Sequence, residues 1–403
     1  ESRKRKMKLP DYYEFQSAAK IMSGKFALEN IPQEMRNLHA VHPMILSDNM
    51  LEKIGTLQKV LDALASQGME AGAIYTDIPA DSSLHVVNGI AKEFKRKNCD
   101  SLIAVGGGSV IDTAKGVRML LSQDMDDILE VWGCENLTMG HRVPFIAVPT
   151  TSGTGSESTL VAVIKNEARK LKMEFISYYL QPDVAVLDVR MTETLPPRMT
   201  ASTGMDALCH ALEAYSCIQK NPVSDAYAVK AIELIRDNLE RAVSRGHDGQ
   251  ARLAMANASL MAGSAFSNSM VGLVHAIGHA LGGVCHVPHG DAMTILMPHG
   301  MAYNYADERT RQLYGELLLP LAGEEIYFST PKAQRAKQAI KEVWSLRKRL
   351  HRSCGLSVRL RDFDVNPEDF EKVAETAIND GAMLVNPRKA DVEDVLFILK
   401  KAF

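Results

Sequence analysis

The stretch SLIAVGGGSVIDTAK, residues 101–115, joins an apolar run, a glycine turn and a mixed pattern of apolar and polar residues. The apolar run is typical of a buried strand, and the mixed pattern that follows suits a helix packed on a sheet. Glycines let a backbone approach a phosphate closely, and the amides at a helix N-terminus attract anions. We expect Ser109 to cap this helix, with Asp112 three residues on in a capping-box arrangement. A tight turn that binds nothing remains an open alternative, because the GxGxxG pattern is absent.

Strand and helix alternate through the first half of the chain, which is typical of parallel α/β structure. After the double proline at residues 196–197, helical periodicities replace the short apolar runs. We therefore predict two domains, an α/β dinucleotide-binding domain with a Rossmann-like parallel sheet at residues 1–193 and an all-helical metal-binding domain at residues 194–403. The double proline would lie at the hinge. Strands are expected at residues 44–46, 72–75, 101–105, 144–148 and 184–187, and helices at 49–66, 82–96, 201–215, 222–242, 250–267, 273–281 and 332–351.

The composition indicates an ordinary globular protein. Of 403 residues, 46% are hydrophobic and 24% charged, and the formal net charge is -3, which gives no reason to expect nucleic acid as a partner. The basic cluster at residues 3–6 is short, as in a solvated tail. Six cysteines without CxxC spacing indicate reduced thiols. No apolar run resembles a signal peptide or a membrane span, so we expect a cytoplasmic protein without a membrane partner.

A second small-residue turn, PTTSGTGSE at residues 149–157, follows the predicted strand at 144–148. Alone it would be an ordinary loop, but two such loops at the ends of parallel strands favour a bound nucleotide. Asp48 follows the strand at 44–46, where a carboxylate can accept hydrogen bonds from an adenosine ribose and repel a 2′-phosphate. This would favour NAD over NADP, although Asp48 could equally cap the next helix.

Histidines and one aspartate form the strongest pattern in the second half. Asp206 and His210 are four residues apart, so they share one helical face, and His275 and His279 repeat that spacing. His289 follows closely. Three imidazoles and a carboxylate suit Fe(II), Zn(II) or Mn(II). A single HxxxH pair is more often a coincidence of packing, so the prediction depends on their accumulation; we interpret the remaining local histidines, His247, His286 and His299, as loop or packed residues.

The stretch from Leu253 to Glu308 contains neither lysine nor arginine. A site for a phosphorylated or carboxylate substrate would normally supply cations. The sequence therefore favours a small neutral substrate.

The chain closely resembles the iron-containing, or group III, alcohol dehydrogenase family over nearly its whole length. The motifs that carry the resemblance are GGGSVIDTAK (106–115), PTTSGTGSE (149–157), PDVAVLD (182–188), LPPRMTASTGMDALCHALEAY (195–215) and the His275–Gly290 stretch. Two departures stand out. Many members carry Asn-Pro-Thr where this chain has Ala80-Asp81-Ser82, and Cys209 stands where threonine is frequent.

The resemblance implies a dehydroquinate synthase-like fold and a commonly dimeric, sometimes larger, homo-oligomer. It implies one divalent metal, with iron favoured over zinc and manganese, and a small primary alcohol, diol or aldehyde as substrate. His279 would lie near the nicotinamide and relay protons. By this likeness the metal ligands are Asp206, His210, His275 and His289; the cofactor contacts are Asp48, Gly107, Gly108, Ser109, Thr150, Thr151, Thr154, Lys172 and His279; and Val161 and Phe266 lie near the substrate.

The activity expected is hydride transfer between an alcohol and NAD, assisted by a metal that lowers the pKa of the alcohol. A glycerol dehydrogenase of the same fold is an alternative, which a substrate panel would distinguish. A dehydroquinate-forming cyclase is disfavoured by the missing cations. A catalytically silent NAD- or metal-binding regulator is a third alternative, which intact glycine and ligand motifs disfavour.

Overall fold

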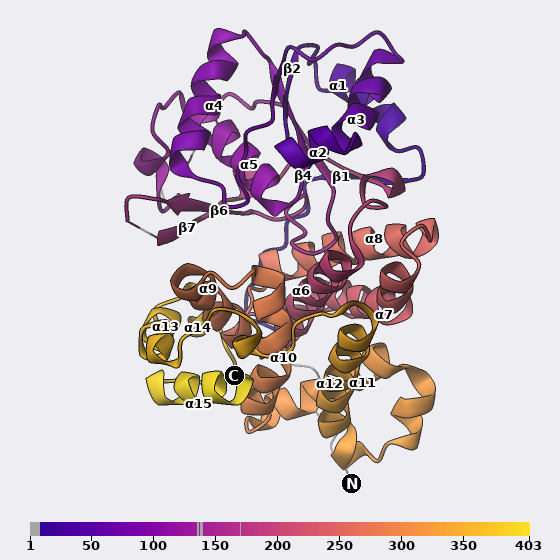
Figure 1. Ribbon diagram of the computed structural model, residues 1–403, viewed down its shortest axis with the longest axis vertical. Coiled ribbons are helices and arrows are strands. Elements are labelled where there is room, and N and C mark those ends of the chain that lie inside the picture. The colour runs from indigo at the N-terminus through magenta and orange to yellow at the C-terminus, as the bar shows by residue number, and fades with distance from the viewer. Residues whose placement is uncertain (1–8, 135–136, 138–139, 170) are drawn as a thin grey trace.

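The computed structural model describes residues 9–134, 137, 140–169 and 171–403. A part built around a parallel sheet ends with β8, and an all-helical part begins with α6; Figure 1 shows the first above the second. The predicted fold class is confirmed.

The sheet has six parallel strands in the order β1-β8-β5-β4-β2-β3. All five predicted strands are present within one or two residues. An additional edge strand, β1, was not predicted because its sequence KIMSG mixes polar and apolar residues on a half-exposed segment. The strands are β1 (Lys20–Gly24), β2 (Pro43–Leu46), β3 (Ala73–Tyr75), β4 (Ser101–Gly106), β5 (Phe145–Pro149) and β8 (Val184–Asp188).

Helices cover both faces of this sheet. α1 (Ile31–Asn37) and α3 (Thr56–Ala65) bury their apolar residues against one face, and α4 (Leu84–Arg96) and α5 (Gly108–Gln123) cover the other. The single helix predicted at residues 49–66 is wrong. Gly55 adopts a left-handed conformation (φ 78°), which ends α2 (Asn49–Lys53) and starts α3.

An antiparallel hairpin, β6 (Val161–Asn166) and β7 (Leu171–Ile176), projects from the sheet part on the side that faces the helical part (Figure 1). One face is packed into the core through Ala162, Ile164, Met173 and Phe175. This hairpin was not predicted, although the strict alternation of apolar and polar residues in 171–175 was a usable signal.

The helical part buries one large apolar cluster. The double proline does not form a free linker, because Pro196 is the N-cap of α6 and Pro197 is its first residue. The α-helices of the helical part are α6 (Pro197–Ser216), α7 (Pro222–Ser244), α8 (Gly249–Ser267), α9 (Leu273–Cys285), α10 (His289–Asn304), α11 (Glu308–Ser329), α12 (Arg335–Cys354), α13 (Phe370–Ile378), α14 (Gly381–Leu384) and α15 (Val392–Ala402).

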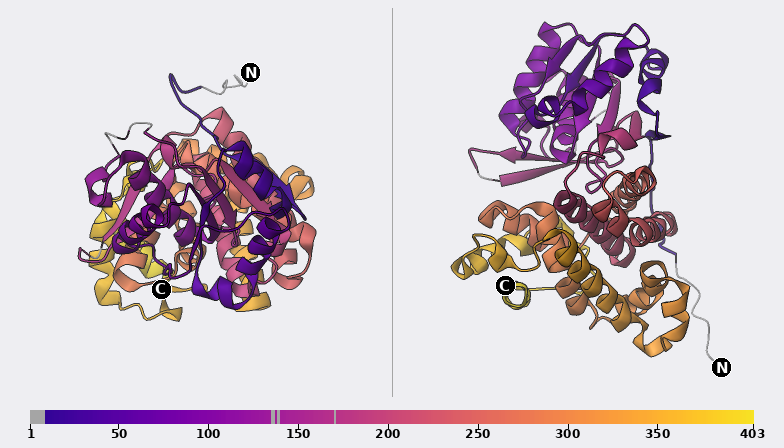
Figure 2. Two further views of the ribbon diagram at one scale, coloured as in Figure 1. Left: turned by 90° about the horizontal axis from the view of Figure 1, so that it is seen from above. Right: turned by 45° about the vertical axis from the view of Figure 1, so that its right-hand side comes forward.

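The two parts are held together at several points. Ala185 and Leu187 of β8 pack on Ala256 and Leu260 of α8. The N-terminal segment runs along the helical part before it enters the sheet (Figure 2), and Gln16 exchanges hydrogen bonds with Asn268. Among the described residues, no helix is both long enough and apolar enough to cross a bilayer.

Candidate metal centre and cofactor cleft

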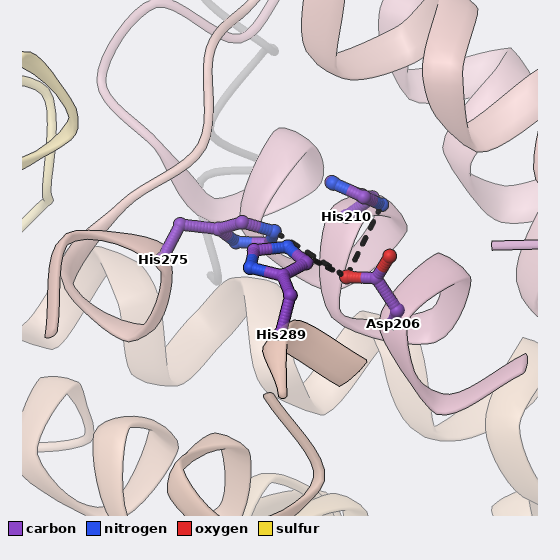
Figure 3. Close-up of side chains that lie close together, drawn as sticks. All are labelled: Asp206, His210, His275 and His289. Atoms are coloured by element: carbon purple, nitrogen blue, oxygen red, sulfur yellow. Dashed lines mark ion pairs between the residues drawn. The ribbon is translucent and has the colours of Figure 1, made fainter. Parts of the chain in front are cut away.

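Four predicted residues converge at one point in the helical part. Asp206 and His210 come from α6, His275 from α9, and His289 is the first residue of α10. Figure 3 shows the three imidazoles around the Asp206 carboxylate. From Asp206 Oδ1, the distances are 3.8 Å to His210 Nδ1, 3.8 Å to His275 Nε2 and 3.3 Å to His289 Nε2.

Close helix packing brings these side chains together. A Cβ on Gly290 would lie 2.6 Å from Ser202 Oγ, and a Cβ on Gly278 would lie 1.9 Å from Met293 Cε. These glycines therefore allow the start of α10 to approach α6, and α9 to approach α10. Asp206 and His210 share a helix face because they are four residues apart.

The donor atoms fit a divalent metal. Asp206 Oδ1, His210 Nδ1 and His275 Nε2 are buried and make no hydrogen bond, which is costly unless another partner binds them. Distances of 3.3–3.8 Å are close to the ligand–ligand spacing of about 3.4 Å expected around a tetrahedral ion with bonds of about 2.1 Å.

Burial and the contacts among these groups shift their pKa values in different directions. Burial lowers the pKa of His210 to about 3, so its imidazole is neutral. Burial alone would raise the pKa of Asp206, but the facing histidines, first His210 and His289, hold it well below its usual range. Contacts with Cys209, Asp206 and Glu213 outweigh burial and raise the pKa of His275 well above its ordinary value, so a metal binding there would displace a proton from this imidazole.

Glu213 supports this centre and was not predicted. Its Oε2 lies 2.5 Å from His275 Nδ1, and its Oε1 accepts a 2.8 Å hydrogen bond from the Val274 amide. Glu213 follows Asp206 by seven residues on α6, so helical spacing was the signal that could have found it. A carboxylate behind a ligating histidine fixes which nitrogen is free for the metal.

His279 belongs to a neighbouring group. Its Nδ1 lies 2.9 Å from Asp380 Oδ2 and 3.7 Å from Glu174 Oε1, and its ring stacks on His289 with centroids 5.5 Å apart. Neither carboxylate was predicted, because both are about a hundred residues from His279 in sequence.

A cavity of about 540 Å³ joins the histidines to the glycine turn. Its lining includes residues predicted to bind the metal, the cofactor and the substrate. Phe266 stacks on His210 with ring centroids 4.3 Å apart, and Val161 lies on the hairpin wall. The predicted residues that line the cavity are Gly108, Ser109, Thr154, Val161, Lys172, His210, Phe266, His275, His279 and His289.

The glycine turn differs from the prediction in one respect. Gly107, not Ser109, is the N-cap of α5, and Ser109 Oγ instead donates a hydrogen bond to the Ala80 carbonyl. Asp112 accepts from Ser156 Oγ and the Val163 amide. The predicted capping box is therefore wrong, because the helix begins before Ser109.

The second loop lies directly against this turn. The Thr150 amide donates to the Gly106 carbonyl at 3.0 Å, and a Cβ on Gly107 would meet Thr151 at 3.4 Å. A Cβ on Gly108 would lie 2.9 Å from Thr154 Cγ2, so a larger residue would displace the loop.

Two predicted cofactor contacts are occupied by protein groups. Asp48 caps α2 by accepting 2.9 Å hydrogen bonds from the Met50 and Leu51 amides, which is the capping alternative. Lys172 forms a 2.9 Å ion pair with Asp81, the residue that departs from the family pattern. Cofactor contact by either residue stays a prediction.

The other residues singled out have ordinary surroundings. His299 packs edge-on against Trp344, and His247 is exposed in a turn. Burial raises the pKa of Cys209 to about 12, so this thiol is packed and protonated rather than reactive. His286 lines the cavity at the end of α9.

Comparisons with known proteins identify the family to which the chain belongs. The model of iron-containing alcohol dehydrogenases matches residues 18–189, and that of the C-terminal part of the Fe-containing alcohol dehydrogenase family matches residues 200–403. The chain belongs to the iron-containing alcohol dehydrogenase family. It is thus an alcohol dehydrogenase, an oxidoreductase, and the resemblance predicted from its motifs is confirmed.

Relatives of this dehydrogenase align over most of its length. It is 36% identical to the NAD-dependent methanol dehydrogenase of Bacillus methanolicus over 384 residues, covering 94% of this chain and 97% of the relative. It is 37% identical to the 1,3-propanediol dehydrogenase of Klebsiella pneumoniae over 390 residues, covering 94% and 96%. The crystal structure of a 1,3-propanediol oxidoreductase superposes with a TM-score of 0.91 at 34% identity, covering 97% of this chain and 100% of that one.

Proposed function

We propose that this dehydrogenase transfers a hydride between a small neutral primary alcohol or diol and NAD, with one divalent metal held by Asp206, His210, His275 and His289. Iron is the favoured metal, with zinc and manganese as alternatives. The observation that carries the proposal is the convergence of these four side chains, with unpaired buried donor atoms, on the cavity that also reaches the glycine turn.

The sheet part supplies cofactor binding in this proposal. The free amides at the N-terminus of α5, next to Gly107, Gly108 and Ser109, attract the pyrophosphate of the dinucleotide. Thr150, Thr151 and Thr154 lie against the same turn and offer hydroxyls. Asp48 follows β2 and disfavours a 2′-phosphate, which supports NAD over NADP.

The helical part supplies the chemistry. When bound, the metal contributes a Lewis acid that lowers the pKa of the alcohol. His279 presents Nδ1 to Asp380, which leaves Nε2 to exchange a proton with the alcohol hydroxyl or a water. Phe266 and Val161 exclude water from one side of the cavity and provide apolar contact for the alcohol.

The organisation follows from these assignments. We propose residues 1–193 as the NAD-binding domain and residues 194–403 as the metal-binding domain. We also propose a cytoplasmic homodimer or larger homo-oligomer, which sedimentation of the purified protein would test.

The experiment that tests the function replaces His210 or His275 with alanine. We expect both variants to lose bound metal and alcohol-dependent NADH formation while binding NAD with the affinity of the wild type. His247→Ala, in an exposed turn, is the matched control and should retain metal and activity. Anaerobic reconstitution with iron, zinc and manganese would identify the metal. Turnover by protein shown to be metal-free would contradict the proposal.

A further inference from the structure

The β6–β7 hairpin presents one face to the active-site cavity. The strand register pairs Val161 with Ile176, Val163 with Glu174, and Lys165 with Lys172. All six of these residues line the cavity, whereas the residues between them are buried in the core. Because side chains alternate along a strand, Glu174 is fixed on the cavity side. It is the one carboxylate among these six residues, with Val163 across from it and Lys172 and Ile176 on either side along β7.

The two lysines on the same face do not neutralise Glu174. Both are directed at Asp81 on the opposite loop, with Lys172 Nζ at 2.9 Å and Lys165 Nζ at 3.9 Å from that carboxylate. The wall formed by residues 253–308 carries no lysine or arginine. His279 Nδ1 lies 3.7 Å from Glu174 Oε1 but only 2.9 Å from Asp380 Oδ2.

Glu174 therefore keeps free capacity to accept hydrogen bonds. Within the part of the chain that the structure describes, no side chain or amide donates a hydrogen bond to it, and only a third of its side chain is exposed (34%). Burial, together with the charge of Asp380, raises the pKa of Glu174. A partly desolvated carboxylate of this kind is stabilised when a ligand brings a donor to it.

We infer that Glu174 determines substrate specificity by accepting a hydrogen bond from a second donor group at the far end of the alcohol. The inference rests on the proposed function and narrows its substrate class. The cavity then selects short diols or amino alcohols over alkanols of the same length, and its negative charge opposes hydroxy acids. His279 lies between His289 and Glu174, with its ring centroid 5.5 Å from that of His289 and its Nδ1 3.7 Å from Glu174 Oε1. All three residues line one cavity, so a short molecule can reach from the histidine cluster to the hairpin.

The experiment compares substrates that differ only at the far end. The series runs from 1,2-ethanediol to 1,5-pentanediol, each paired with the alkanol in which the second hydroxyl is a methyl group. 3-Amino-1-propanol and 3-hydroxypropanoate extend the three-carbon member to a cation and an anion. The variants are Glu174→Leu and Glu174→Gln. The control is Glu167→Gln, which removes a charge from the exposed turn of the same hairpin.

We expect the wild type and Glu167→Gln to prefer the diol of matching length, by kcat/KM, about 10- to 100-fold over its alkanol partner. Glu174→Leu should remove this preference by losing activity toward the diol while keeping activity toward the alkanol. Glu174→Gln, which keeps an acceptor oxygen, should lose only part of the preference for the diol. A stronger preference for 3-amino-1-propanol, lost in the same variant, would identify an ammonium as the donor.

Calorimetric titration of a diol and its alkanol partner into the protein–NAD complex gives a readout independent of turnover. If kcat/KM, or Kd, changed equally for the diol and its alkanol partner in Glu174→Leu, the role of Glu174 would be overturned. Failure of the wild type to oxidise any alcohol would contradict the proposed function instead, and the binding comparison would still decide the role of Glu174.

Discussion

The carboxylate of Glu213 and the imidazole of His275 form a buried contact in which Oε2 and Nδ1 are 2.5 Å apart. Since Nδ1 donates to this carboxylate, Nε2 is the nitrogen left to bind a metal, and it is Nε2 that faces Asp206. Glu213, which is not one of the four proposed ligands, therefore orients the imidazole of a proposed ligand, His275.

Replacing Glu213 with glutamine should weaken metal binding about 10- to 100-fold, because the tautomer and orientation of His275 are no longer enforced. Metal retained after dialysis against a graded chelator series measures the effect. Glu316→Gln, which removes a carboxylate bonded to Tyr215 near the surface, is the control. Unchanged retention in Glu213→Gln would show that His275 needs no such support.

The side chain of Lys115 links α5 to residues 156–161 through hydrogen bonds. Its buried Nζ donates to Ser156 Oγ, Thr159 Oγ1 and the Val161 carbonyl at 2.7–2.9 Å. Lys115→Met should lower the free energy of unfolding by about 3–5 kcal/mol, because Asp112 would lose its buried partner. Urea denaturation measures this, with the exposed Lys92→Met as control; equal losses in both variants would refute the argument.

His299 makes stability depend on pH. Burial, helped by the charges of Arg347 and Lys401, lowers its pKa from 6.5 to about 4. The folded protein thus holds His299 neutral while the unfolded chain protonates it, so its contribution to stability is complete above pH 6.5 and is lost as pH falls toward 4.

The thermal midpoint should therefore fall less in His299→Gln than in the wild type between about pH 7 and about pH 5. His247→Gln, at an exposed position, should behave like the wild type. Calorimetry across this range is the measurement, and identical pH profiles for all three proteins would contradict the assignment.

The central sheet was predictable because its strands are buried on both faces and appear as continuous apolar runs, as in β4 and β5. β1 lies at the sheet edge and carries Lys20 and Ser23, so it gives no such run. The break at Gly55 was also missed, because apolar spacing continues across it and only the backbone conformation separates α2 from α3.

The clustering of Asp206, His210, His275 and His289 was predictable because Asp206 and His210 are one helical turn apart and because the motifs resemble a known family. Their surroundings were not. Asp380 meets His279 across 101 residues, and Glu213 meets His275 across 62. Such pairs depend on how helices pack, and local periodicity carries no information on that packing.

Helix α6 bears Asp206, His210 and Glu213 within two turns, so the centre depends on the phase of a single helix. Each residue rotates an α-helix by about 100°. Inserting or deleting one residue between Asp206 and Glu213 would rotate the residues on one side of the change by about 100° relative to those on the other, so the three side chains would no longer face the same point. Substitutions of the intervening residues can be tolerated. Insertions and deletions in active homologues, however, should be absent from this segment.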